Sequence, residues 1–444
     1  MTSTPDFAAL DRGAPVTLRR ARVPLPFLSD APPGLVADRD TAALVDVTLA
    51  GGRVTAVAAA SGDLGFGDID LDGRHLWPTL VDVHAHLDKA HIVDRAPNPT
   101  GDFMGARDAT QADRAAHWRP PDLRRRMEFG LRCAEAHGVS AIRTHLDSYE
   151  GQAPDTWAVF AEMRDAFAGR VALQAVALVA LDVFATPFAS TLADLVAETG
   201  GLMGGVTRAT AGLHEDELAD LEAVLDRLFT LARERDLDVD LHVDESGDPT
   251  GAALPVVARA TMRHGYEGRV TCGHCCSLAL QDYGTMADHI ALVRDAGIAI
   301  VTLPTVNMYL QDRIAGRTPR WRGVTPVKEL RAAGVRVAVA GDNCRDPFYA
   351  YGDHDMLDTW RQGVRILHLD HPFGDATALC GPAGADIMGL AHAGRIAVGG
   401  TADLIVLNAR AMDQVIARPQ ADRIVIRGGR RLAASLPDYQ ELER

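Results

Sequence analysis

The chain of 444 residues contains few lysines and cysteines, and these shortages limit the kinds of site that the protein can contain. Only Lys89 and Lys328 are lysines, so arginine supplies nearly all of the 45 basic residues, which indicates a compositional bias. Six cysteines are too few for a disulfide framework in a chain of this length. The net charge of −15 argues against nucleic acid or an anionic membrane as the main partner.

Long hydrophobic runs are missing as well. The longest, such as VALQAVALVAL at residues 171–181, are far shorter than a membrane span. The first ten residues, MTSTPDFAAL, lack a basic stretch followed by an apolar one, so we expect no secretory signal and a cytoplasmic protein. The composition is that of a globular protein, and the length suits a barrel with an accessory domain.

One cysteine pair matches a known metal or redox spacing. Cys272 and Cys275 form the sequence CGHC, but no second pair accompanies them and no thioredoxin-like pattern flanks them. We therefore interpret these residues as reduced, buried cysteines near the end of a strand.

The two ends of the chain read as short strands joined by turns. Residues 1–77 contain alternating runs on either side of Gly51-Gly52, and residues 396–444 contain similar runs around Gly428-Gly429. We expect both ends to join in one small β-sandwich domain that flanks the central segment, residues 78–395.

The central segment alternates eight short apolar runs with amphipathic helical stretches such as residues 216–235. This pattern predicts an α/β protein with a (β/α)8 TIM barrel. A doubly wound open sheet is the alternative, but no run is followed by a Gly-x-Gly-x-x-Gly loop. The eight runs are residues 79–84, 139–145, 171–180, 202–207, 237–242, 269–274, 298–304 and 335–342.

Histidine and acidic side chains stand at the C-terminal ends of several of these predicted strands. Barrel enzymes have their active sites at these strand ends. Imidazoles and one carboxylate at a common rim suit a transition metal such as zinc or iron, which lowers the pKa of a bound water to about 7. A metal pair would need a bridging group such as a modified lysine at a strand end. Neither lysine stands there, so one ion is expected. The side chains at the strand ends are His84, His86, His145, His242, Glu245, His274 and Asp342.

These motifs resemble the amidohydrolase superfamily, and within it the cytosine deaminase branch. The superfamily pattern is His-x-His after the first barrel strand, LHVDE after the fifth, CGH after the sixth and GDN after the eighth. Further similarity to the branch lies in RTHLDS (143–148), LPTVNMYLQDR (303–313), RGVTPVKEL (322–330) and DPFYAYGDHDML (346–357). The segment GTADLIVLNA (400–409) is typical of the flanking sandwich.

The resemblance implies roles for individual residues. The ligands of one divalent metal ion, zinc or iron with manganese as a further option, would be His84, His86, His242 and Asp342. Glu245 resembles the acid/base that protonates the ring nitrogen, and His274 resembles the histidine that hydrogen-bonds the attacking hydroxide. Asp342 would also accept the proton of the water and pass it toward the leaving ammonia.

The implied reaction is hydrolytic deamination of an amino-substituted nitrogen heterocycle of the cytosine, isocytosine, isoguanine, creatinine or pterin type. An alternative is hydrolysis of a cyclic amide or of the C–N bond of an N-alkylamino-triazine with the same metal chemistry. A metal-binding scaffold without catalysis is a third hypothesis, and Glu245 argues against it because a structural site needs no unligated carboxylate. The partner is then a small heterocycle, with a homo-oligomer as an open option.

Two positions depart from the cytosine-specific members of the branch. Ala180 stands where those members have a glutamine that reads the pyrimidine edge, and Asn343 stands where they have a second aspartate. A missing hydrogen bond costs discrimination on the order of 1–3 kcal/mol, so cytosine itself is in doubt. The candidate substrate contacts are Ala180, Asn307, Gln311, Asn343 and Phe348. His145 is expected behind the ligands, and Lys89 and His91 are expected at the pocket mouth or in a solvated loop.

Overall fold

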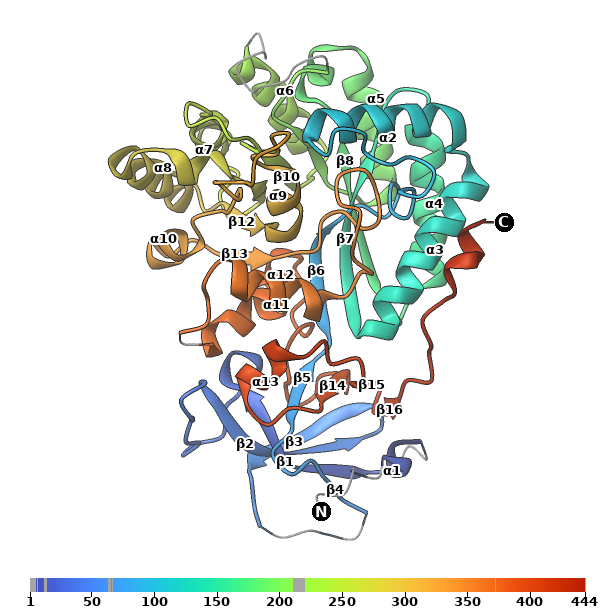
Figure 1. Cartoon of the computed structure of the whole chain (residues 1–444), viewed down its shortest axis with the longest axis vertical. Coiled ribbons are helices and arrows are strands. Elements are labelled where there is room, and N and C mark those ends of the chain that lie inside the picture. The colour runs from blue at the N-terminus through green and yellow to red at the C-terminus, as the bar shows by residue number, and fades with distance from the viewer. Residues whose placement is uncertain are drawn as a thin grey trace. The chain divides into compact units, whose positions relative to one another are not determined.

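The computed structural model of the chain (Figure 1) describes residues 5, 7–11, 14–62, 65, 67–210, 220–371 and 373–443. The chain divides into two compact units. The first comprises Met1–Val81, Cys133–Ala141 and Asp355–Pro437, and the second comprises Asp82–Arg132, Ile142–His354 and Asp438–Arg444.

The first unit is built on a mostly antiparallel sheet to which both ends of the chain contribute (Figure 1). Its eight strands follow the order β16-β15-β14-β5-β1-β2-β3, with β4 beside β1. The Gly51-Gly52 and Gly428-Gly429 pairs join antiparallel neighbours, so both predicted hairpins are confirmed. The strands are β1 (Val16–Pro24), β2 (Ala42–Ala50), β3 (Arg53–Ala59), β4 (Ile69–Asp70), β5 (His75–Pro78), β14 (Leu404–Leu407), β15 (Ile424–Arg427) and β16 (Arg430–Arg431).

The helices of the first unit lie mainly in its C-terminal segment. They are α1 (Ala8–Asp11), α11 (Met356–Ile366), α12 (Pro382–Ile387) and α13 (Met412–Ala417). Buried aromatic rings pack in this unit, with the Trp77 ring on β5 meeting Trp360 on α11 edge-on at a centroid distance of 4.9 Å. Phe27 packs against the same Trp77 ring at 5.1 Å, so these large side chains form part of the core of the unit.

The middle of the chain, most of which belongs to the second unit, alternates strands and helices, and each of the eight apolar runs identified in the sequence overlaps one strand. This confirms an α/β fold. The strands are β6 (Leu80–Ala85), β7 (Val139–Asp147), β8 (Ala172–Leu178), β9 (Met203–Val206), β10 (Val239–Val243), β11 (Val270–His274), β12 (Ala299–Thr302) and β13 (Val337–Val339). The helices are α2 (Phe103–His117), α3 (Pro120–His137), α4 (Ala153–Ala166), α5 (Phe188–Thr199), α6 (Leu221–Glu234), α7 (Ala253–His264), α8 (Tyr283–Asp295), α9 (Pro304–Leu310) and α10 (Val327–Ala332).

Five of these strands form a parallel sheet in the order β13-β12-β11-β10-β9, and β6, β7 and β8 form a second sheet. Every residue of β10, β11 and β12 is buried, as expected for parallel strands covered on both faces. Isolated parallel bridges join Ala85 to Asp342 and Ala180 to Val206. Because parallel strands end at one edge, side chains far apart in sequence meet there.

In the described part of the chain, no helix has both the length and the apolar composition that a bilayer crossing requires.

A buried ion pair ties three segments of the first unit together. Arg423 donates to both carboxylate oxygens of Asp355 at 2.6 and 2.7 Å, and also to the His137 carbonyl at 3.2 Å. Asp355 additionally caps α11 by accepting from the Leu357 amide at 3.0 Å. Only 6% of the Arg423 side chain and 12% of the Asp355 side chain are exposed, so the pair is shielded from solvent.

We predict that Arg423→Ala lowers the free energy of unfolding by about 3–5 kcal/mol, because it leaves a buried carboxylate without its counter-charge. Urea unfolding followed by circular dichroism measures the loss. The matched control is Arg431→Ala, whose exposed pair with Asp11 should contribute little. Equal unfolding midpoints for the two variants would contradict the importance of the buried pair.

Candidate metal centre and pocket

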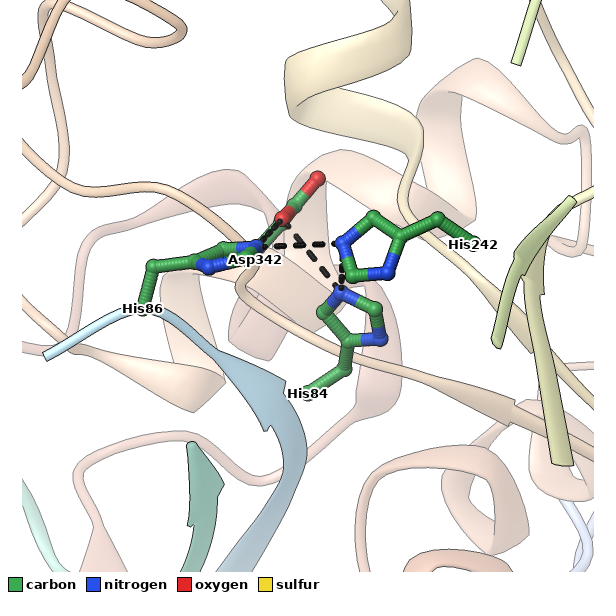
Figure 2. A group of neighbouring side chains, drawn as sticks. All are labelled: His84, His86, His242 and Asp342. Carbon is green, nitrogen blue, oxygen red and sulfur yellow. Dashed lines mark hydrogen bonds and ion pairs between the residues drawn. The ribbon is translucent and has the colours of Figure 1, made fainter. Parts of the chain in front are cut away.

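Four buried side chains converge at the ends of strands β6 and β10 and just beyond β13 (Figure 2). The Nε2 atom of His242 lies 3.1 Å from Nε2 of His84 and 3.3 Å from Nε2 of His86. The Asp342 Oδ1 atom lies 3.1 Å from His86 Nε2 and 3.6 Å from His84 Nε2. Spacings of this size suit donors that share one ion at about 2.0–2.2 Å. The structure thus brings together the four residues predicted as ligands.

Strand geometry, two hydrogen bonds and one glycine position these donors. His84 and His86 are two residues apart at the end of a strand, so their side chains point the same way. The buried carboxylate of Asp82 accepts from the Gly341 amide at 2.9 Å, and the Asp342 amide donates to the His84 carbonyl at 2.7 Å. A Cβ atom on Gly273 would come within 2.9 Å of His84 Cε1, so glycine leaves room for that ring.

The unsatisfied polar atoms of the cluster fit a bound cation. The His86 Nδ1 atom faces the His145 carbonyl at 3.2 Å, which assigns the N–H to Nδ1 and leaves the Nε2 lone pair facing the cluster. Among the described residues, neither oxygen of Asp342 accepts a hydrogen bond, and Nδ1 of His84 and of His242 has no partner. Lone pairs held this close repel one another unless a positive charge lies between them.

The pKa directions agree with a metal-binding set. Burial lowers the pKa of His84, His86 and His242 well below the ordinary value, so the imidazoles are neutral, the form that binds metal. Burial also raises the pKa of Asp342 well above its ordinary value, and the nearby Glu245 carboxylate adds to the rise. A cation bound at the cluster would lower the pKa of Asp342, because it favours the ionised carboxylate.

Two further predicted residues face the cluster. His274, the last residue of β11, has its Nδ1 atom 3.5 Å from Glu245 Oε1 and its Nε2 atom 3.9 Å from Asp342 Oδ2. The Asn307 amide lies 2.9 Å from His274 Nδ1 and donates to it, which leaves the N–H on Nε2, directed toward Asp342. Burial lowers the pKa of His274 to about 3, with the Arg208 charge adding, so this ring is neutral at pH 7.

His145 lies behind the ligands, where it was expected. Its ring stacks on His84 at a centroid distance of 3.9 Å, and its carbonyl orients His86. Its Nε2 atom is 3.9 Å from Asp240 Oδ1, and Asp240 accepts from Arg143 at 2.8 Å. Of these buried groups, His145 contacts the His84 and His86 side chains directly, and within the described residues it does not line the cavity.

A cavity that opens to solvent adjoins this donor set. His86, His242, Glu245, His274 and Asp342 contribute to its wall. Of the five candidate substrate contacts, three also line it: Ala180, Asn343 and Phe348. The remaining two lie behind catalytic candidates. Asn307 contacts His274, and Gln311 donates to the Glu245 carbonyl at 3.4 Å.

Lys89 and His91, for which the sequence left two options, both prove to be buried. Lys89 lines the cavity, where its Nζ atom donates to Asp147 at 2.7 Å. Arg114 donates to the other oxygen of Asp147 at 3.0 Å. His91 is not among the residues that line this cavity in the described part of the chain.

Sequence reasoning missed several residues of the pocket wall. Arg208 donates to the Glu245 carbonyl at 2.6 Å and stacks over the Phe103 ring at 4.1 Å. It follows β9 by two residues, so the rule that found the other strand-end residues could have found it. Arg114 and Phe103 lie on α2, where no spacing in the sequence distinguishes a pocket residue from a surface residue.

The cysteines match their interpretation as reduced and buried. All six, including Cys272 and Cys275, are free and buried.

Comparison with known proteins gives a family and a fold. A pterin deaminase of Rhizobium rhizogenes is 52% identical over 375 residues, which cover 84% of each chain. An N-isopropylammelide isopropyl amidohydrolase of a Pseudomonas species is 27% identical over 401 residues, 87% of this chain and 92% of the relative. The crystal structure of a 5-methylcytosine deaminase from Klebsiella pneumoniae with 5-fluorocytosine has a TM-score of 0.79 at 24% identity, covering 96% and 98% of the two chains.

The similarity to the solved structure supports the α/β fold with parallel strands described above. The model of the amidohydrolase family matches residues 101–433, about three quarters of the chain. The sequence resemblance is therefore confirmed, and the chain belongs to the amidohydrolase family.

Proposed function

We propose that this protein hydrolytically deaminates an amino-substituted nitrogen heterocycle of the pterin type, releasing ammonia. The observation that carries the proposal is the 52% identity to a pterin deaminase over 84% of both chains. The convergence of three histidines, an aspartate and the nearby Glu245 beside one cavity supports the same reaction class. The reaction consumes one water, replaces the exocyclic amino group by a carbonyl and leaves the ring closed.

The proposed ligands of one divalent metal ion are His84, His86, His242 and Asp342. Three imidazoles and one carboxylate suit zinc or iron, and they also accept manganese. When bound, such an ion lowers the pKa of water and supplies a nucleophile at neutral pH. Lys89, the lysine nearest the centre in sequence, is paired with Asp147, which agrees with a single ion without a lysine bridge.

The proton transfers belong to three side chains of this protein. We assign Glu245 the protonation of the ring nitrogen beside the amino-bearing carbon. His274, with its Nε2–H directed toward Asp342, would hydrogen-bond the attacking oxygen. Asp342 would accept the proton of the attacking water and deliver it to the departing amine. Collapse of the tetrahedral intermediate then gives the carbonyl product and ammonia.

The pocket has room and an aromatic wall for a bicyclic ring. Ala180, the residue in place of a glutamine, lines the cavity with a single methyl group. Phe103 and Phe348 meet edge to face at 5.6 Å and line the same cavity. A planar heterocycle packs well against such rings. The small side chain at position 180 therefore supports a larger ring than cytosine.

The domain plan is part of the proposal. We propose that the eight strands close into a (β/α)8 barrel within residues 78–395, and that residues 1–77 and 396–444 form a β-sandwich. The bridge from Ala85 to Asp342 supports closure on one side, and the bridge from Ala180 to Val206 supports it on the other. Homo-oligomer formation and a cytoplasmic location stay predictions.

We predict that the metal-loaded protein releases ammonia fastest from a pterin in a panel that also contains cytosine, isocytosine, isoguanine, creatinine and an N-alkylamino-triazine. A coupled ammonia assay with product identification measures this. The N-isopropylammelide isopropyl amidohydrolase, at 27% identity, supports one alternative, which is hydrolysis of the C–N bond of an N-alkylamino-triazine. Release of an alkylamine from the triazine, with no ammonia from any other ring, would favour that second function.

We predict that Glu245→Gln keeps the metal and lowers kcat by about 10²–10⁴-fold, because the amide retains the shape but cannot donate the ring proton. Steady-state kinetics and metal analysis on the same preparation test this. Glu267→Gln, at an exposed glutamate, is the matched control. Unchanged turnover in Glu245→Gln would refute the assigned role.

We predict that His84→Ala loses about one metal ion per chain relative to the parent protein, since it removes a donor from a tetrahedral set. Mass-spectrometric metal analysis after dialysis measures the difference. His371→Ala, at a histidine whose side chain is 86% exposed, should bind as much metal as the parent. Equal metal content in all three proteins would mean that the ligand set is wrong.

A further inference from the structure

A second cluster of metal-binding side chain types lies in the same unit, outside the cavity. His91, Cys344 and His354 are all buried, and one donor atom from each lies within 4.8 Å of the others. His91 follows β6, Cys344 follows β13, and His354 precedes α11. The cluster shares no residue with the centre at His84, His86, His242 and Asp342.

Backbone contacts hold the three residues in place. The His91 amide donates to the Cys344 carbonyl at 3.1 Å, and the Cys344 sulfur accepts from the His354 amide. His91 and His354 have φ angles of 62° and 53°, in the left-handed region that is costly for most side chains. Backbone strain of this kind persists only where the surrounding structure imposes it, and it is common at ligand-binding sites.

The helix beside the cluster leaves space for it. A Cβ atom on Gly130 of α3 would lie 2.8 Å from His354 Nε2 and 3.1 Å from His354 Cδ2. A larger residue at this position would therefore occupy the place of the imidazole ring. The Phe129 ring meets His91 nearly edge-on at 4.8 Å, and the two imidazoles are 5.3 Å apart between centroids.

The His91 side chain supplies the observation that points to a ligand. It is 7% exposed, and within the described residues neither Nδ1 nor Nε2 has a hydrogen-bond partner. Most buried side-chain polar atoms have a hydrogen-bond partner, and a neutral imidazole offers one donor and one acceptor. An imidazole with both nitrogens unsatisfied, directed toward a thiol and a second imidazole, is the arrangement that a metal ion completes.

We propose that His91, Cys344 and His354 bind a second metal ion, of the zinc class, with a structural role. One thiolate and two imidazoles select zinc or another borderline to soft ion over magnesium or calcium, which prefer oxygen. Three protein donors leave one position of a tetrahedron for a further donor. The Asp353 carboxylate interacts electrostatically with both His91 and Cys344, so it adds negative charge beside the ion.

An ion at this place would fasten the segment from Asn343 to His354 to the loop that carries His91. That segment begins directly after Asp342 and contains Asn343 and Phe348, which line the cavity. The proposed ion therefore stabilises the pocket wall without touching the substrate. The inference is independent of which heterocycle the protein deaminates.

Cobalt(II) distinguishes the two sites because only the second contains sulfur. A cysteine thiolate bound to cobalt gives a charge-transfer band in the near ultraviolet, whereas nitrogen and oxygen donors do not. We expect the full-length protein produced in cobalt-supplemented medium to carry about two cobalt ions per chain and to show this band. A parent protein with about one cobalt ion and no band would overturn the proposal, whatever the variants do.

Variants then test whether Cys344 is the source of the charge-transfer band. Cys344→Ala should lose the band and about half of the cobalt, whereas Cys380→Ala, at a buried cysteine of the first unit, should keep both. His84→Ala should lose about half of the cobalt and keep the band. A band that persists in Cys344→Ala would place the thiolate elsewhere and overturn the assignment. If Cys344→Ala fails to fold, His91→Phe should remove the same band, and its retention would overturn the proposal.

Discussion

Three imidazole nitrogens and one carboxylate oxygen meet in a buried space in which too few N–H or O–H groups are available to donate hydrogen bonds to them. Several neighbouring parts of the second unit hold these four groups together. His242 stands 3.1 Å from His84, and Asp342 stands 3.1 Å from His86, so their lone pairs oppose one another unless a cation joins them. The strand ends, the Gly273 position and the His145 carbonyl all serve to hold the four groups at these distances. In the proposed site, both the stability of this cluster and its chemistry would depend on one bound cation.

Two residues outside the donor set, His274 and Glu245, are each held in position by a neighbouring side chain. Burial lowers the pKa of His274 and keeps the ring neutral, and Asn307 donates to its Nδ1 atom, so in the proposed reaction His274 would offer an N–H at Nε2. Glu245 is held through its backbone, whose carbonyl accepts from Arg208, and this leaves its carboxylate to face the cavity. Fixed dipoles and charges of this kind act without reorganising during the reaction, which is the main advantage of a preorganised site.

The strand ends were predictable from the sequence because apolar runs mark them, and in a parallel sheet strand ends share one edge. This reasoning found His84, His86, His242, His274 and Asp342 without any coordinates. Residues brought in by helices or by loop packing carried no such signal. Arg114 on α2 looks like any exposed helical arginine, and Asn307 looked like a substrate contact because its place behind His274 depends on how α9 packs. His91 was expected at the pocket mouth or in a solvated loop, since burial beside Cys344 and His354 cannot be read from spacing.

The hydrogen bond from the Gly341 amide to Asp82 joins residues 259 positions apart in the chain, and it lies beside the metal centre. The two N-terminal histidines are consequently synthesised long before the carboxylate that completes their set. Until that carboxylate is in place, His84 and His86 alone supply only two of the four proposed donors. In the proposed site, the full donor set would therefore exist only after the segment that follows the last strand has docked beside the first, which would make metal acquisition depend on a contact between distant parts of the chain.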